Sequence, residues 1–256
     1  MRTGSGRLKP TSTGVVAKRA TSLHRSAAAH VGRRIVIGEW TVGSALPNEA
    51  DLARELSVSR ASLREAIKLL AGKGLIRSAP RRGTVVQPRD TWNRLDPDVL
   101  IWQATGGPTL AFVRDLFELR RMIEPEAAAQ TAIRGSEDAR RAVADAYAAM
   151  ASASEENEAI TADLEFHKAI LLGTGNELIA AFVPAMEATL GVSFRDAKNA
   201  GVDTAQMLRR HESIANAIAS ADPEGARRAM RELLASAEDD AVRAVENRKQ
   251  AASVKV

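Results

Sequence analysis

Apolar positions between residues 46 and 86 change their spacing along the chain, and this change predicts two short helices followed by a β-hairpin. Over residues 49–56 the apolar side chains fall on one helical face, and Asn48 precedes them as a residue type that caps helix N-termini. Over residues 60–72 apolar side chains recur three and four residues apart, as on one face of a second helix: Leu63, Ala66, Ile67 and Leu70. A short break at 57–59 separates the two, so the pattern is that of a helix-turn-helix.

The first turn of the second predicted helix carries side chains that can read DNA. Ser59 is placed to cap this helix, although Ser62 stands where a glutamate would complete a capping box. Arg60 and Arg64 stand beside these serines. Arginine and serine reach guanine edges and phosphates when a helix N-terminus enters the major groove, so this turn is the predicted DNA-reading surface.

A basic hairpin follows the second helix. Gly72 and Gly74 end the helix, and residues 76–78 and 83–87 have the composition of two short paired strands. The basic turn at residues 80–83 lies between them. The plain alternative is a helical hairpin with a solvated basic face. The basic β-hairpin at a fixed distance behind the helix pair favours a winged helix-turn-helix instead.

The stretch from Ile35 to Val86 resembles the winged helix of the GntR family of bacterial transcription regulators. The resemblance rests on Gly38, Gly43, Leu46, Pro47, Glu49, Leu52, Ala53, Val58, Ser59, Arg60, Arg64, Glu65, Ala66, Leu69, Gly74, Leu75, Gly83 and Thr84. It implies DNA contacts from the recognition helix at Ser59, Arg60, Ser62 and Arg64, and from the wing at Arg82, Gly83 and Thr84. Ala50 stands where the FadR type often has an arginine, so a contact from that position is absent.

From about Asp98 onward the chain is rich in Ala, Glu, Leu and Arg, and no strand alternation occurs. The pattern predicts helices near residues 98–104, 109–134, 137–153, 157–172, 176–198, 203–220 and 223–247. Pro184 inside the fifth of these helices should kink it. Several helices joined by short loops make a bundle, which can build a ligand site from facing side chains. The expected fold class is therefore mainly α: an N-terminal winged helix-turn-helix with a small β-wing, and a C-terminal all-α antiparallel helical bundle.

The length of 256 residues suits two compact domains. The expected division is a disordered basic tail at 1–20, the winged helix at 21–90, a linker at 91–97, the helical bundle at 98–247 and a tail at 248–256. The chain has no cysteine, no apolar run long enough to span a bilayer and no signal-peptide pattern. These features predict a cytoplasmic protein without disulfides, thiolate metal sites or a membrane partner.

Charge is divided unevenly along the chain. Residues 1–90 contain 17 Lys and Arg against 6 Asp and Glu, whereas the remainder contains 19 against 26. A basic N-terminal part attracts the phosphate backbone of DNA, with an affinity that falls steeply with salt. The acidic part is expected to make no DNA contact.

The helical part resembles the FCD effector domain of the FadR subfamily over nearly its whole length. The matching segments are residues 117–125, 163–167, 211–218 and 226–234. The connector from Trp92 to Trp102 is similar to the linker of the branch that responds to sugar acids such as galactonate. The resemblance implies a small acidic effector bound inside the bundle.

Asp163 and His167 lie four residues apart, so they share one face of a helix and can bind one divalent cation. The FCD resemblance adds His211 as a further ligand. Leu233 stands where family members commonly supply a third histidine, so the site would have three protein ligands and open positions for water or an effector's oxygens. Zn, Ni and Mn all suit such a site. The alternative is a metal-free polar pocket lined by the same residues.

An arginine near the start of the bundle is a candidate partner for an anionic effector, because a guanidinium matches a carboxylate with two hydrogen bonds. Arg120 lies beside the apolar stripe of its helix, which makes it a better candidate than Arg121. A surface ion pair with Glu124 is the alternative role for Arg120. Arg195 and Lys198 are weaker candidates for the same task.

These features predict a homodimeric DNA-binding transcription regulator rather than an enzyme. Two winged helices would read a short inverted repeat in double-stranded DNA, and the family resemblance implies a repressor. A small carboxylate effector, such as a sugar acid or other hydroxy acid, would bind at Arg120, Asp163, His167 and His211 and shift operator affinity. Three alternatives stay open: a fatty acyl-CoA effector, a bundle that serves only dimerisation, and a metal-dependent hydrolase, for which no positioned nucleophile or base is found.

Overall fold

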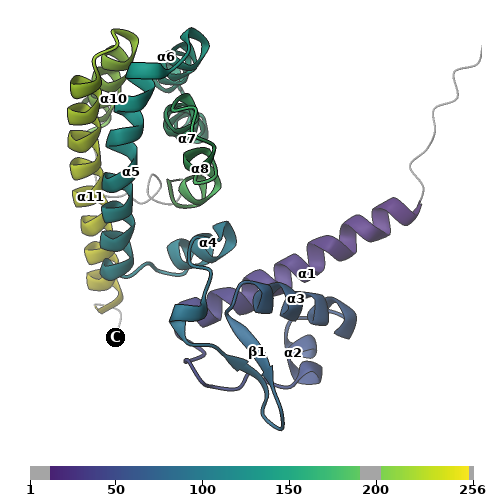
Figure 1. Cartoon of the computed structure of the whole chain (residues 1–256). Helices are drawn as coiled ribbons and strands as arrows, with labels where there is room; N and C mark the ends of the chain where they lie inside the picture. Colours follow the sequence, from purple (N-terminus) through teal and green to yellow (C-terminus); the bar gives the residue numbers. More distant parts are fainter. Residues whose placement is uncertain (1–11, 191–202, 254–256) are drawn as a thin grey trace, which may run out of the picture. The chain divides into compact units, whose positions relative to one another are not determined.

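Helices and one β-hairpin form the N-terminal unit of the computed structural model, which describes residues 12–190 and 203–253 (Figure 1). In chain order they are α1 (Ser12–Val36), α2 (Glu49–Glu55), α3 (Arg60–Gly72), β1 (Ile76–Ala79), β2 (Gly83–Val86), a short 3-10 helix (Arg89–Thr91) and α4 (Pro97–Thr105). This unit reaches Trp102, and the C-terminal unit begins at Gln103. The helix pair followed by a two-stranded sheet confirms the expected winged helix-turn-helix.

Local capping fixes the two helices of the helix-turn-helix. The Asn48 side chain accepts hydrogen bonds from the backbone N–H groups of Ala50 and Asp51, at 3.1 and 3.0 Å. The Ser59 hydroxyl accepts one from the N–H of Ser62 at 3.1 Å. Both caps agree with the prediction from sequence, because an N-cap depends only on neighbours a few residues away.

The hairpin pairs β1 and β2 in antiparallel register, from Ile76 opposite Val86 to Ala79 opposite Gly83. Ile76 and Val86 are buried in the core of the unit, whereas the turn between the strands is exposed. Arg81 and Gly83 both take left-handed backbone conformations, with φ of 62° and 74°. These two residues close the tight, exposed turn of the wing.

The long helix α1 corrects the expectation of a disordered tail over residues 1–20. Residues 12–20 belong to this helix, and residues 1–11 lie outside the described part of the chain. The C-terminal half of α1 buries Val31 and Ile35 in a core shared with α3. Once such packing fixes a helix, each further residue adds a hydrogen bond at little cost, so composition is a poor guide to where the helix begins.

The connector after the wing packs onto the N-terminal unit. Trp102 is buried in its core. Lys73 Nζ, just after α3, lies 2.7 Å from Asp96 Oδ1 and 2.8 Å from Asp98 Oδ2. The division between the units therefore falls after Trp102, later than the expected start of the bundle at residue 98. The sequence did not reveal this, because the residue that Trp102 packs against is Gly32, far away in α1.

Replacing Gly32 by alanine is expected to destabilise the N-terminal unit. A Cβ at Gly32 would lie 2.2 Å from the ring of the buried Trp102, and overpacking of this kind costs about 1–3 kcal/mol. Denaturant unfolding followed by tryptophan fluorescence measures this loss, since all three tryptophans lie before residue 103. Gly72→Ala is the control, because a Cβ there meets nothing within 4 Å. Equal stability of the two variants would contradict the packing of Trp102.

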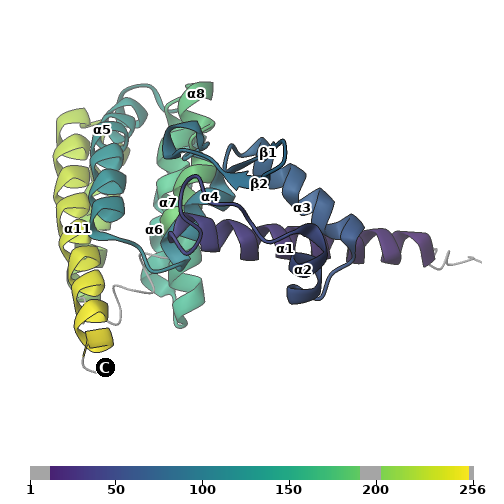
Figure 2. The same ribbon diagram turned by 90° about the horizontal axis from the view of Figure 1, so that it is seen from below.

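The C-terminal unit is a bundle of helices. They are α5 (Leu110–Arg134), α6 (Glu137–Ser152), α7 (Glu156–Gly173), α8 (Glu177–Ala180), a helical stretch at 183–190, α10 (Thr204–Ala219) and α11 (Pro223–Ser253). α5 and α11 lie side by side over much of their length in both views (Figure 1 and Figure 2). Phe166, Ile170, Met186, Ile214 and Met230 are among the side chains buried between the helices. The regular structure in the described residues of this unit is entirely helical, which confirms the expected fold class.

The fifth predicted helix of the bundle differs from the expectation. α8 ends at Ala180, and Pro184 lies in the first turn of the stretch at 183–190 rather than inside a long kinked helix. A proline fits there because the first N–H groups of a helix need no partner within it. The part of the prediction beyond residue 190, with the anion candidates Arg195 and Lys198, lies outside the described residues.

The last helix is longer than expected. α11 continues to Ser253, so the tail expected from residue 248 is helical up to that point, and residues 254–256 lie outside the described chain. No helix in the described residues is long and apolar enough to cross a membrane.

Candidate DNA interface and candidate effector site

The N-terminal turn of α3 presents polar side chains on the surface of the N-terminal unit. Arg60 and Arg64 are exposed, and Arg64 Nε donates a hydrogen bond to Glu49 Oε2 on α2 at 2.9 Å. The Ser59 hydroxyl donates to Ser62 Oγ at 3.0 Å while it caps the helix. Arg60 has no hydrogen bond or ion pair to any described residue, so its guanidinium is the donor most fully available to a partner.

The wing adds a second exposed basic surface to the same unit. Arg82 is exposed, and its Nη2 donates to the backbone oxygen of Gly43 at 3.1 Å. Gly83 and Thr84 follow at the start of β2. Arg81 is a further exposed cation at the turn and a further candidate for a DNA contact. Its position directly before Arg82 in the sequence is the signal that points to it. A polar helix N-terminus and a basic wing on one unit suit the major groove and the phosphates beside it.

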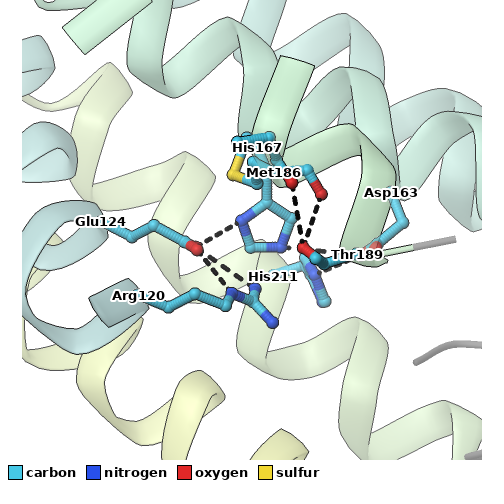
Figure 3. A network of polar contacts seen from close by, with 8 residues as sticks. Arg120, Glu124, Asp163, His167, Met186, Thr189 and His211 are labelled. Atoms are coloured by element: carbon cyan, nitrogen blue, oxygen red, sulfur yellow. Dashed lines mark hydrogen bonds and ion pairs between the residues drawn. The ribbon is translucent and has the colours of Figure 1, made fainter. Parts of the chain in front are cut away.

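A cluster of charged side chains lies inside the C-terminal bundle (Figure 3). Arg120 and Glu124 come from α5, Asp163 and His167 from α7, and His211 from α10. Each of them is at most 6% exposed. Charged groups are rarely buried this deeply without partners, so their mutual contacts define what the site can do.

Glu124 is the member of the cluster whose role the sequence did not reveal. Arg120 Nε donates to Glu124 Oε1 at 2.6 Å, so the ion pair considered from sequence exists, but it is buried rather than at the surface. Glu124 Oε2 also lies 2.8 Å from His167 Nδ1. Burial alone would raise the pKa of Glu124, but Arg120 and His167 outweigh it and lower the pKa to about 2. The carboxylate therefore stays ionised and holds two side chains in place.

The contact with Glu124 orients the ring of His167. A carboxylate accepts hydrogen bonds, so the Nδ1 atom that faces Glu124 carries the proton. The angle at Nδ1 is not that of a directed hydrogen bond, although the short distance makes the contact electrostatically favourable. The other ring nitrogen, Nε2, then carries a lone pair and lies 3.7 Å from Asp163 Oδ1. A carboxylate behind a histidine is the usual support of a metal-binding imidazole.

His211 faces Asp163 with a lone pair as well. Its Nδ1 lies 2.9 Å from the backbone oxygen of Met207, which can only accept, so Nδ1 carries the proton. Its Nε2 lies 3.1 Å from Asp163 Oδ1 and has no hydrogen-bond partner among the described residues. Two acceptors at this distance repel each other unless a proton or a cation lies between them. The buried Nε2 atom of His211 therefore fits a metal ligand.

Asp163 completes a set of three ligand atoms. One atom from each of Asp163, His167 and His211 lies within 4.8 Å of the other two. Burial would raise the pKa of Asp163, but positive charge beside it, on the two imidazoles when they are protonated and on Arg120, outweighs burial and lowers the pKa, so the carboxylate is charged at neutral pH. Two imidazoles and one carboxylate are suitable ligands for Zn, Ni or Mn.

The charged cluster opens onto a cavity of about 330 Å³ within the bundle. Leu233, from α11, is buried and lines this cavity, so its position adds an apolar wall and no further ligand. Arg120 also lines the cavity, and its Nε and Nη2 atoms face Glu124, which leaves Nη1 for a ligand. A small molecule in this space would meet charged groups at one end and apolar walls that include Phe117 and Met150.

A winged helix joined to a helical bundle whose cavity borders a buried charged cluster defines the class of a DNA-binding transcription regulator with a separate ligand domain. The model of the bacterial regulatory proteins of the gntR family matches residues 23–86, and that of the FCD domain matches residues 115–236. The chain belongs to the GntR family of bacterial regulatory proteins and carries an FCD domain.

Similar proteins include both a transcriptional repressor and a transcriptional activator. The chain is 30% identical over 208 residues to the galactonate operon transcriptional repressor of Escherichia coli K12, covering 80% of this chain and 91% of that protein. It is 29% identical over 213 residues to the Glc operon transcriptional activator of the same strain, covering 79% and 82%. The solved structure of Lar, which controls expression of the Listeria monocytogenes agr system, shares the fold with a TM-score of 0.59 at 20% identity, over 86% of this chain and 96% of that chain. The protein is thus a DNA-binding transcription regulator and not an enzyme.

Proposed function

We propose that this regulator binds a divalent cation at Asp163, His167 and His211 and a small hydroxy-carboxylate beside it, and that this ligand changes its affinity for operator DNA. The observation that carries the proposal is the buried Nε2 atom of His211, which faces the Asp163 carboxylate and has no donor in the described part of the bundle. A cation at this point would satisfy both groups at once.

The residues around the cation would act together on the ligand. Glu124 holds the His167 ring with its Nε2 toward the cluster. Arg120 offers Nη1 to the carboxylate of the ligand and balances its charge. When bound, the cation would supply positive charge and open coordination positions for carboxylate and hydroxyl oxygens. Leu233 leaves these positions to the ligand.

A sugar acid or other hydroxy acid suits the cavity better than the two alternatives for the bundle. A fatty acyl chain would face the charged cluster and leave its buried polar groups without partners. A bundle that served only dimerisation would have no use for a charged cluster beside an internal cavity. One similar protein is the repressor of the galactonate operon, an operon named for a sugar acid.

We propose that the residues predicted from the sequence contact the DNA: Ser59, Arg60, Ser62, Arg64, Arg82, Gly83 and Thr84. The protein would act in the cytoplasm as a homodimer on a short inverted repeat, because a two-fold protein matches a two-fold operator. The proposed direction is repression, as in the similar regulator of the galactonate operon.

The test is a pair of titrations with an operator fragment selected by its binding to the protein. Gluconate with Zn²⁺ is expected to change operator affinity roughly 5- to 150-fold, and the operator should change gluconate affinity by the same factor. Fluorescence anisotropy of the labelled fragment measures the first quantity and calorimetry the second. If operator affinity is unchanged by hexonates, hexuronates, lactate and dicarboxylates, each tested with Zn, Ni or Mn, the proposed effector site is ruled out.

A further inference from the structure

The helix α1 continues well beyond the part of it that packs in the core of the N-terminal unit. It begins at Ser12, whereas buried side chains begin at Ala27 in the part of the helix for which burial is described, residues 23–36. Residues 12–26, which we call the N-terminal extension, span about 22 Å of helix. A helix of this length is only marginally stable in water by itself, so contact with a partner would stabilise the extension.

The N-terminal extension carries charge of one sign only. It contains Lys18, Arg19 and Arg25, and no acidic residue precedes Glu39 in the chain. Exposed helices usually mix both signs, so that opposite charges pair three or four residues apart. Arg25 is exposed and forms no hydrogen bond or ion pair with any described residue. The composition of the extension therefore favours an anionic partner.

The helices α1 and α3 lie side by side and run in the same direction. His24 of α1 lies close enough to Glu65 of α3 to act on its carboxyl group electrostatically. Eight residues later in α1, Gly32 lies under the ring of Trp102, and the centre of that ring is 5.9 Å from Lys73 Nζ, just after α3. The N-terminal extension therefore points toward the end of α3 that is predicted to read DNA.

The N-terminal extension also reaches past this end of α3. From His24 the helix continues for twelve residues to Ser12, about 18 Å, whereas only five residues, about 8 Å, separate Glu65 from Arg60 at the start of α3. Both views show α1 continuing beyond the start of α3 (Figure 1 and Figure 2). The start of such a helix enters the major groove, so a helix that passes it comes close to the phosphates that border the groove.

We propose that the N-terminal extension binds the sugar-phosphate backbone of DNA beside the bases that α3 reads, as a contact that does not depend on sequence. DNA carries one negative charge about every 1.7 Å along its axis, so a basic helix beside it meets phosphates at any sequence. Each such contact releases counterions, which raises affinity about 5-fold at 0.15 M salt relative to 1 M. The contact adds to those of α3 and the wing, and it is independent of the effector site.

Anisotropy titrations of the full-length protein test this contact, with a labelled operator fragment and an unrelated duplex at about 0.05 to 0.3 M salt. Arg25→Gln should lower the slope of log affinity against log salt by about 0.9 and weaken binding about 5-fold at 0.15 M. Combining it with Lys18→Gln and Arg19→Gln should lower the slope by up to about 3. Both duplexes carry the same phosphates, so their affinity ratio should not change. Glutamine matches lysine and arginine in helix propensity, so the helix is kept.

Two controls match these variants in charge. Arg33→Gln changes an exposed arginine on the same helix, next to Gly32 and beside the end of α3 that points away from the groove, and should leave the slope unchanged. A combination of three substitutions in the C-terminal unit removes the same net charge as the triple variant at exposed side chains: Arg134→Gln, Arg209→Gln and Arg228→Gln. It should also leave the slope almost unchanged. The melting temperature of each variant shows whether it is folded.

The outcomes are distinct from those of the effector titrations, because neither a cation nor an acid is added. An unchanged salt slope in the triple variant of the extension would overturn the proposal and leave α1 with a solvated end. Equal losses in the two triple variants would overturn it as well, because net charge alone would then account for the effect. A loss for the operator without a loss for the unrelated duplex would indicate a base contact and contradict binding to phosphates.

Discussion

Arg60→Ala is expected to weaken operator binding by roughly 5- to 150-fold for each half-site, because loss of an arginine contact to a base edge costs about 1–3 kcal/mol. Arg60 lies exposed in the first turn of α3, and no described residue holds its guanidinium away from DNA. The variant should also discriminate less between operator and unrelated DNA. Anisotropy titrations with the operator and with a scrambled fragment measure both effects, at one salt concentration because affinity depends on salt.

Lys68→Ala is the matched control for this variant. It removes one positive charge from the same helix, about two turns after Arg60, at an exposed side chain that pairs with Glu65. Both variants lose a similar share of the general attraction to phosphates, so only the base contact distinguishes them. Equal losses for the two variants, on both fragments, would show that Arg60 contributes its charge alone.

His167→Ala is expected to remove the bound cation almost completely. His167 supplies one of the three candidate ligands, and zinc sites in proteins keep at least three protein ligands. Elemental analysis of protein purified without chelator or affinity tag should find a stoichiometric cation in the wild type and almost none in the variant. Thermal stabilisation by gluconate should disappear with it, since a ligand of the folded state raises the melting temperature.

Two other variants define what this loss means. His30→Ala controls for removal of an arbitrary histidine, because His30 is exposed on α1. Glu124→Gln keeps the size of the side chain but weakens the support of His167, and such outer partners are worth about 10- to 100-fold in metal affinity. Unchanged metal content in His167→Ala would place the ion elsewhere. A wild-type protein that takes up neither Zn, Ni nor Mn would favour the metal-free polar pocket.

The helix-turn-helix could be predicted from sequence because its determinants are local. Asn48 and Ser59 cap helices through N–H groups two and three residues away, and Gly74 takes a left-handed conformation, with φ of 76°, just after α3. Such capping signals can be recognised from a few neighbouring residues of the sequence. The start of α1 could not be predicted in this way. The helix is stabilised by packing at its C-terminal half, and it extends from there into a segment whose composition is typical of disorder.

The buried cluster was predictable only in part. Asp163 and His167 share a helical face by their spacing, so their proximity follows from one helix alone. The contact of Glu124 with His167 joins α5 to α7, and no spacing within either helix encodes it. Four-residue spacing between Arg120 and Glu124 is also typical of exposed ion pairs. Only the packing of the bundle shows that this pair is buried and supports a histidine.

The docking of α4 onto the N-terminal unit determines where this regulator can be divided and recombined. Trp102 lies over Gly32, and Lys73 binds the aspartates that begin α4, so this helix is part of the DNA-binding module. A chimera cut within the connector before α4 would strip a buried tryptophan from that module. A fusion that carries this chain through Thr105 and joins a foreign sensor within residues 106–109 would keep the module whole, provided that the foreign sensor is trimmed of its own equivalent of α4.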